Sequence, residues 1–115
     1  MNIEDIQAIC KKLPAVTEDI KWEDHLCFNV GGKMFLVTAP DHVPVTASFK
    51  VSDEDFETLP EKKGFSPAPY MARYKWIFIE DIKLMNKKQW QYFIQQSYNL
   101  VKDKLPGKTK KELGK

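Results

Sequence analysis

The chain has 115 residues, of which 43% are hydrophobic, 30% are charged and 12% are aromatic. A chain of this length is expected to form one domain that buries roughly two thirds of its unfolded surface. No run approaches the roughly 20 apolar residues of a membrane span. The N-terminal residues are acidic and amphipathic, unlike a signal peptide, so we expect a cytoplasmic protein with no membrane contact.

The net charge of +2 conceals an uneven distribution along the chain. Residues 1–61 contain 12 acidic and 5 basic side chains, whereas residues 62–115 contain 4 acidic and 13 basic side chains. A fold that keeps the two halves apart would present a basic surface that attracts polyanions. A fold that interleaves them would present an ordinary mixed surface.

Helices are expected at both ends of the domain. Asn2 caps the first helix, whose apolar stripe ends before Pro14. Asn86, with Gln89 placed for a capping box, begins a long final helix that ends at residues 106–107. Its apolar face is formed by Trp90, Phe93, Ile94, Ser97, Val101 and Leu105. We therefore take residues 1–106 as one domain and residues 107–115 as a basic, frayed tail.

The middle of the chain is predicted to form strands. Alternating apolar residues on both sides of the Gly31-Gly32 turn predict a hairpin in which Val30 pairs with Lys33 and Phe28 with Phe35. Residues 45–50 predict a third strand with an apolar inner face and a polar outer face of Thr46, Ser48 and Lys50.

Three further segments complete the expected fold. Ser52 caps a short acidic helix, and residues 76–79 are apolar on both faces, which favours a central strand. Residues 15–24 form a loop or an edge strand. Within them Trp22 is interpreted as a lid on the core, with an exposed stacking platform as the alternative.

Motifs for catalysis and for metal binding are missing from the sequence. His25 and His42 lie in no HxxxH, HExxH or Cys-His pattern, and Zn²⁺ requires three or four converging ligands. Cys10 and Cys27 have no CxxC spacing, which favours buried free thiols over a disulfide or a metal site. We expect a protein that is not an enzyme and uses no cofactor.

The stretch 65–76 is the best candidate for contact with a ligand. It contains Arg73, the only arginine of the chain, in a segment with two prolines that leads into the apolar strand. Basic side chains bind phosphate, and aromatic rings stack on unpaired bases. Arg73 could also lock a corner of the fold instead of facing a ligand. The candidate contact residues are Arg73, Lys75, Tyr70 and Tyr74, with Lys33, Lys62 and Lys63 as possible neighbours in space.

Several motifs together resemble one known family, over nearly the whole chain. They are Leu13-Pro14 with Trp22, the hairpin Phe28-x-Val30-x-Gly32-Lys33-x-Phe35, Ser52, Pro67-x-x-Tyr70-x-x-Arg73-x-x-Trp76, and Ser97-Tyr98 before Leu105-Pro106. With these motifs the sequence resembles the MmcQ/YjbR family. The resemblance implies an α+β fold similar to frataxins (CyaY-like), a two-layer sandwich with an antiparallel sheet of about five strands packed on N- and C-terminal helices. It also implies DNA binding through a double-wing arrangement. Tyrosine at position 70 departs from members that carry histidine there.

We therefore expect a nucleic-acid-binding protein, with DNA as the first candidate, that is a monomer or a weak homodimer. The alternative is a non-enzymatic module that binds a small ligand or another protein. A third hypothesis, weak iron binding, follows from the frataxin-like fold and would use the acidic residues Glu4, Asp5, Glu18 and Asp19.

Overall fold

The computed structural model describes residues 2–69 and 71–107 of the chain. Six strands form one antiparallel sheet in the order β1-β2-β3-β4-β6-β5. Their bounds are β1 Val16–Lys21, β2 His25–Val30, β3 Lys33–Ala39, β4 Thr46–Lys50, β5 Phe65–Pro67 and β6 Trp76–Ile79. The α+β class with an antiparallel sheet is confirmed, with one strand more than expected.

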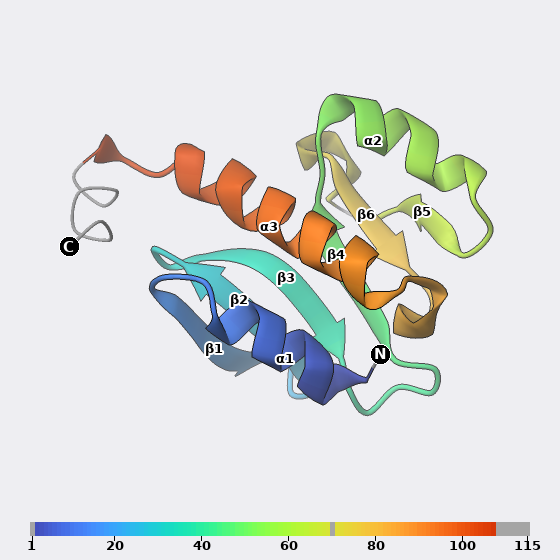
Figure 1. Ribbon diagram of the computed structural model, residues 1–115, viewed down its shortest axis with the longest axis horizontal. Coiled ribbons are helices and arrows are strands. Elements are labelled where there is room, and N and C mark those ends of the chain that lie inside the picture. The colour runs from blue at the N-terminus through green and yellow to red at the C-terminus, as the bar shows by residue number, and fades with distance from the viewer. Residues whose placement is uncertain (1, 70, 108–115) are drawn as a thin grey trace.

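Two long helices cover one face of the sheet. Figure 1 shows α1 (Ile3–Lys11) and α3 (Lys87–Asp103) lying in front of the strands, while α2 (Asp53–Thr58) lies beside β5 and β6. Three short 3₁₀ turns complete the elements: η1 (Leu59–Glu61), η2 (Ala72–Tyr74) and η3 (Ile82–Leu84). The expected placement of helices at the two ends of the domain is therefore confirmed.

Both long helices begin after the predicted N-cap residues, and each has a capping box, which the sequence predicted only for the last helix. In α1 the Asn2 side chain accepts a hydrogen bond from the Asp5 N–H at 2.9 Å, and the Asp5 carboxylate accepts one from the Asn2 N–H at 3.0 Å. Asn86 and Gln89 form the same reciprocal pair at the start of α3. Each box satisfies two N–H groups that a helix start leaves without intrahelical partners.

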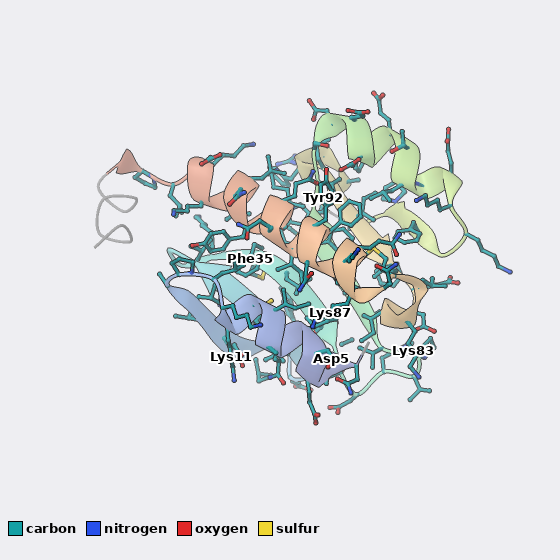
Figure 2. The ribbon with its side chains drawn as sticks, viewed as in Figure 1. Asp5, Lys11, Phe35, Lys83, Lys87 and Tyr92 are labelled. Carbon is teal, nitrogen blue, oxygen red and sulfur yellow. The ribbon has the colours of Figure 1, made fainter. Side chains whose placement is uncertain are left out.

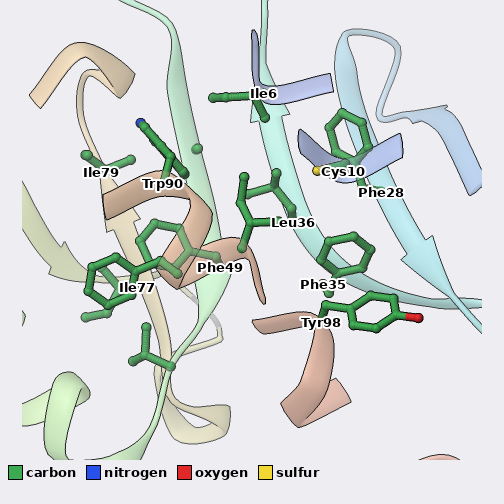
Figure 3. Close-up of a cluster of buried hydrophobic side chains, with 14 of the residues drawn as sticks. Ile6, Cys10, Phe28, Phe35, Leu36, Phe49, Ile77, Ile79, Trp90 and Tyr98 are labelled. Atoms are coloured by element: carbon green, nitrogen blue, oxygen red, sulfur yellow. The ribbon is translucent and has the colours of Figure 1, made fainter. Parts of the chain in front are cut away.

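A single apolar core lies between the helices and the sheet. Figure 3 shows Trp90 and Tyr98 of α3 packed against strand residues such as Phe49 and Phe35. The Trp90 indole also donates a hydrogen bond to the Ile82 carbonyl at 2.8 Å, so its polar atom is satisfied inside the core. All six residues of the predicted apolar face are buried, five of them in α3. The helix ends at Asp103, earlier than predicted, so Leu105 is buried just beyond it.

The hairpin of β2 and β3 has a different register from the one predicted. Val30 pairs with Lys33 as expected, but Phe28 pairs with Leu36 and not with Phe35. A bulge in the hairpin adds one residue to β3, and a bulge of this kind places two residues opposite one. Phe35 and Leu36 are consequently both buried. The predicted pairing of Phe28 with Phe35 is wrong because local alternation carries no signal for the inserted residue.

Trp22 is not a lid on the core. Residues 16–21 form the edge strand β1, and Trp22 begins the three-residue turn that leads to β2. There its backbone is left-handed, with φ 50°, and its side chain is 63% exposed. The ring contacts only the edge of His25 among the described aromatic residues, at 5.8 Å between centroids. The lid interpretation is therefore wrong, and the exposed alternative is the one observed.

The strand β6 lies inside the sheet, between β4 and β5, as its apolar sequence predicted. β5 is the second edge of the sheet and contains Pro67, which is tolerated at an edge because proline has no N–H to donate to a ladder. The segment between these two strands, residues 68–75, contains the candidate contact residues. Of that set, Tyr70 lies outside the described residues.

Candidate anion-binding site

The turn before β6 presents Arg73 and Tyr74 to solvent. Backbone hydrogen bonds hold it in place: the Ala68 N–H binds the Trp76 carbonyl at 3.0 Å, and the Lys75 N–H binds the Ala72 carbonyl at 2.9 Å. Lys75 ends η2 in the left-handed conformation with φ 65°, which redirects the chain into β6. The turn is thus fixed by its backbone, and the side chains of Arg73 and Tyr74 are not needed to shape it.

Arg73 faces solvent and does not lock the fold. Its guanidinium donates a hydrogen bond to the Tyr74 hydroxyl at 2.6 Å and lies 4.8 Å from the centre of that ring. The hydrogen bond to Tyr74 raises the pKa of Arg73 above its ordinary value. Both side chains are exposed, so a cation and an aromatic face are available together at one place on the surface.

Lys50 is a buried charged residue that sequence reasoning missed. It was placed on a polar outer face, yet only 7% of its surface is exposed. Its ammonium donates a hydrogen bond to the Tyr74 carbonyl, directly beneath the exposed turn. The alternation of polar and apolar residues along β4 could not have predicted the burial of Lys50. The contacts come from distant segments, namely the turn at Tyr74 and Ser97 of α3.

Lys75 and Lys104 lie near Lys50. The pKa of Lys50 is lowered first by burial, then by repulsion from Lys104 and Lys75, while Asp53 acts in the opposite direction. Lys104 follows Ser97 by seven residues on the same face of α3, and the Ser97 hydroxyl accepts a hydrogen bond from the Lys50 N–H at 3.0 Å. We call Lys50, Arg73, Lys75 and Lys104 the basic end.

The predicted contact residues are divided between two places. Lys33 begins β3, at the same end of the sheet as the basic end, because β4 ends and β6 begins there. Lys62 and Lys63 precede β5, whose first residue pairs with the last residue of β6. The length of β6 therefore separates them from Lys75, by about 13 Å at 3.3 Å per residue. Lys62 and Lys63 are exposed, but they are not neighbours of Arg73.

The basic end has no carboxylate partner among residues 2–69 and 71–107. The two ion pairs in that part of the chain are Lys11 with Glu18 at 3.8 Å and His25 with Asp24 at 2.8 Å. Figure 2 shows Lys11 on α1, on the opposite side of α3 from α2. Asp53 attracts the Lys50 ammonium without forming an ion pair with it.

A second feature is an apolar groove on the free face of the sheet. Val37 and Phe78 point away from the helices, because their neighbours Leu36 and Ile77 point into the core. Together with Trp22, His25, Pro69 and Met71 they line this groove. None of the four residues of the basic end lines it, although Pro69 and Met71 belong to the same turn segment as Arg73. The groove could accept an apolar partner.

The acidic residues considered for iron do not converge. Within the described ranges there is no group of three or more His, Cys, Asp or Glu that could hold a metal ion. Glu18 lies instead next to Lys11 and Gln7, and Asp19 accepts a hydrogen bond from Asn29 at 2.9 Å. Asp5 is engaged in the cap of α1.

Cys10 and Cys27 are both buried and unbonded to each other, as predicted. Burial raises the pKa of each thiol, and Glu18 raises that of Cys10 further. Thiols of this kind are inert, since the thiolate is the reactive form. In the part of the chain that the structure describes, no helix is long and apolar enough to cross a membrane.

The structure is that of a small α+β protein with exposed basic and aromatic side chains on the turn before β6. The family model YjbR matches residues 11–100, so the chain belongs to the YjbR family. No curated protein matches the chain. The resemblance found in the sequence is therefore confirmed at the level of the family.

Two solved structures share the fold. The protein DR2400 of Deinococcus radiodurans, with a DUF419 domain, superposes with a TM-score of 0.87 at 25% identity, covering 98% of this chain and 88% of that one. A protein from Pseudomonas syringae gives a TM-score of 0.69 at 22% identity, covering 87% of this chain and 98% of that one.

Two residues that carried the resemblance have structural roles here. The Ser97 hydroxyl donates a hydrogen bond to the Phe35 carbonyl, and the Tyr98 hydroxyl donates one to the Pro14 carbonyl at 2.6 Å. They join α3 to β3 and to the turn between α1 and β1.

Proposed function

We propose that this protein binds nucleic acid, with DNA as the first candidate, through phosphate contacts at the basic end. The observation that carries the proposal is the exposed turn with Arg73 and Tyr74, set above Lys50 and beside Lys75 and Lys104. Ammonium and guanidinium groups supply phosphate donors, and the half-exposed Tyr74 ring supplies a stacking face. The proposed activity is binding and not catalysis.

A salt titration of DNA affinity tests the proposal. Each duplex phosphate that the protein neutralises contributes about −0.9 to the slope of log affinity against log salt. Contacts by Arg73, Lys75 and Lys104 therefore predict a slope of about −2.7. Duplex and single strands of the same sequence are compared, because stacking on Tyr74 favours single strands. A flat salt response, or no binding to either at low salt, would refute nucleic-acid binding.

The variant Arg73→Ala separates phosphate contact from structural support. Because the guanidinium is exposed and the turn is held by backbone bonds, the melting temperature stays unchanged. Affinity falls and the slope becomes shallower by about 0.9. The matched control is the double variant Lys62→Ala/Lys63→Ala, just before β5. It leaves the salt slope unchanged if the basic end alone binds. A control variant that weakens binding as much as Arg73→Ala would show that the basic end is not the site.

The alternative is a module that binds another protein through the apolar groove on the free face of the sheet. The specific observation in its favour is that Trp22 stands 63% exposed at the rim of that groove. Binding by apolar burial responds weakly to salt, whereas phosphate binding weakens steeply as salt rises. The same titration therefore separates the two functions.

A further inference from the structure

Lys50 carries a buried positive charge that the described residues satisfy only in part. A lysine ammonium has three N–H donors. Among residues 2–69 and 71–107, one acceptor is present for them, the Tyr74 carbonyl. Only 7% of the surface of Lys50 is exposed, while the hydrogen bond of its ammonium is partly buried. Buried charges in folded proteins are ordinarily paired, which makes this ammonium an exception.

The charges around Lys50 add to the imbalance. Lys104 and Lys75 lie close enough to repel its ammonium, and the exposed Arg73 guanidinium lies on the turn whose Tyr74 carbonyl Lys50 binds. Two influences oppose them: Asp53, which has no ion-pair contact with Lys50, and the C-terminal end of α3, equivalent to about half a negative charge. Of the side chains that act on the Lys50 ammonium, the lysines Lys104 and Lys75 repel it and Asp53 attracts it.

The position of Lys50 is fixed before any ligand arrives. Its N–H is bound by Ser97 of α3 at 3.0 Å, and the next residue, Val51, donates its N–H to the Lys75 carbonyl at 2.9 Å. The stem of Lys75 is held with its ammonium 4.9 Å from the centre of the Phe56 ring. Two cations are thus anchored by neighbouring elements and cost little ordering entropy on binding.

We propose that Lys50, Lys75 and Lys104 form a site for one phosphate dianion. This inference rests on the proposed function, because it takes phosphate as the ligand. It specifies that the bound group is a single terminal phosphate and not the phosphodiester backbone of a nucleic acid. A tetrahedral dianion offers oxygen acceptors to three ammonium groups and neutralises two of their charges. Lysine binds phosphate as a compact point charge, which suits three donors that come from different elements.

Thermal melting in inorganic phosphate tests the site without nucleic acid. At neutral pH and constant ionic strength set with chloride, phosphate that binds the native state raises the melting temperature in a concentration-dependent way. Lys50→Met and Lys104→Gln each remove one charged donor and weaken the apparent phosphate affinity by about tenfold or more. Lys104 is exposed, so its variant folds even if Lys50→Met does not.

The matched control is Lys88→Gln, an exposed lysine at the opposite end of α3, which keeps the wild-type phosphate response. Without phosphate, Lys104→Gln melts no lower than wild type, because relief of repulsion at Lys50 offsets the lost interaction with the helix end. No rise with phosphate in the wild type, or an equal rise in wild type and Lys104→Gln, overturns the inference.

Oligonucleotides with a 5′-phosphate or a 5′-hydroxyl identify the source of the phosphate. Tighter binding of the phosphorylated strand, lost in Lys104→Gln, supports a nucleic-acid terminus. Equal binding of both strands with a retained response to inorganic phosphate supports a small phosphate compound in the same site. If the protein binds DNA but does not respond to phosphate, this site is refuted and the proposed function stands. If it responds to phosphate but does not bind DNA, the proposed function is refuted and this site stands.

Discussion

Replacing Ser97 by alanine tests how the long helix is joined to the sheet. The Ser97 side chain is fully buried, accepts a hydrogen bond from the Lys50 N–H and donates one to the Phe35 carbonyl. It therefore connects α3 to two strands at once. Phe35 lies at the bulge, where the ordinary ladder between β2 and β3 is interrupted.

The expected cost follows from the two backbone groups that the substitution leaves without a partner. Each buried unsatisfied group costs about 1–3 kcal/mol, so we expect a loss of about 2–4 kcal/mol after partial relaxation. At about 4 °C per kcal/mol for a domain of this size, the melting temperature falls by about 8–16 °C.

Urea denaturation followed by circular dichroism measures the free energy of unfolding. Gln91→Ala, on the exposed side of the same helix, is the control and stays within about 0.5 kcal/mol of wild type. A loss below about 0.5 kcal/mol in Ser97→Ala, with an unchanged m value, would refute the reasoning. It would show that water or a small shift of α3 replaces the hydroxyl.

Three further predictions concern the turns and the thiols. Trp22→Asn leaves the free energy of unfolding within about 0.5 kcal/mol of wild type, because the ring is exposed and asparagine tolerates a positive φ. A larger loss in urea denaturation would support the lid interpretation. Gly64→Ala destabilises by about 1 kcal/mol or more, since φ is +90°, whereas Gly107→Ala, with open space around its Cβ position, is neutral in the same assay. Cys10 and Cys27 react with a thiol reagent only after unfolding, and rapid labelling of the native protein would contradict their burial. Because burial raises both thiol pKa values, the unfolded chain loses these protons first. Their contribution to stability is complete below pH 9.0 and declines as pH rises above it, which melting curves across that range will measure.

Most elements of the fold could be predicted because their signals are local. The caps at Asn2 and Asn86 depend on side chains three residues away, and the apolar face of α3 repeats within one helix. The Gly31-Gly32 turn sets the first pair of its hairpin by itself. The bulge at Phe35 lies beyond that range, because burying both Phe35 and Leu36 satisfies contacts with α3 that the strand sequence does not contain.

The candidate site was predicted in part. Arg73 and Tyr74 were found because they are neighbours in the chain, and their exposure agrees with the role proposed for them. Lys62 and Lys63 lie near the opposite end of β6 from Lys75, because β5 and β6 run antiparallel and Phe65 pairs with Ile79. Lys50 gave no signal, since a lysine in an alternating strand normally faces water.

The sequence by itself therefore determined the helices, their caps, most of the strands and the presence of an arginine beside aromatic rings. These depend on periodicity and on hydrogen bonds that close within a few residues. The tertiary structure alone decided the strand order, the exposure of Trp22 and the burial of Lys50 under the turn with Arg73. Each of these depends on which distant segments pack together, and it is this packing that places Lys75 and Lys104 around a charge that the described residues leave unpaired.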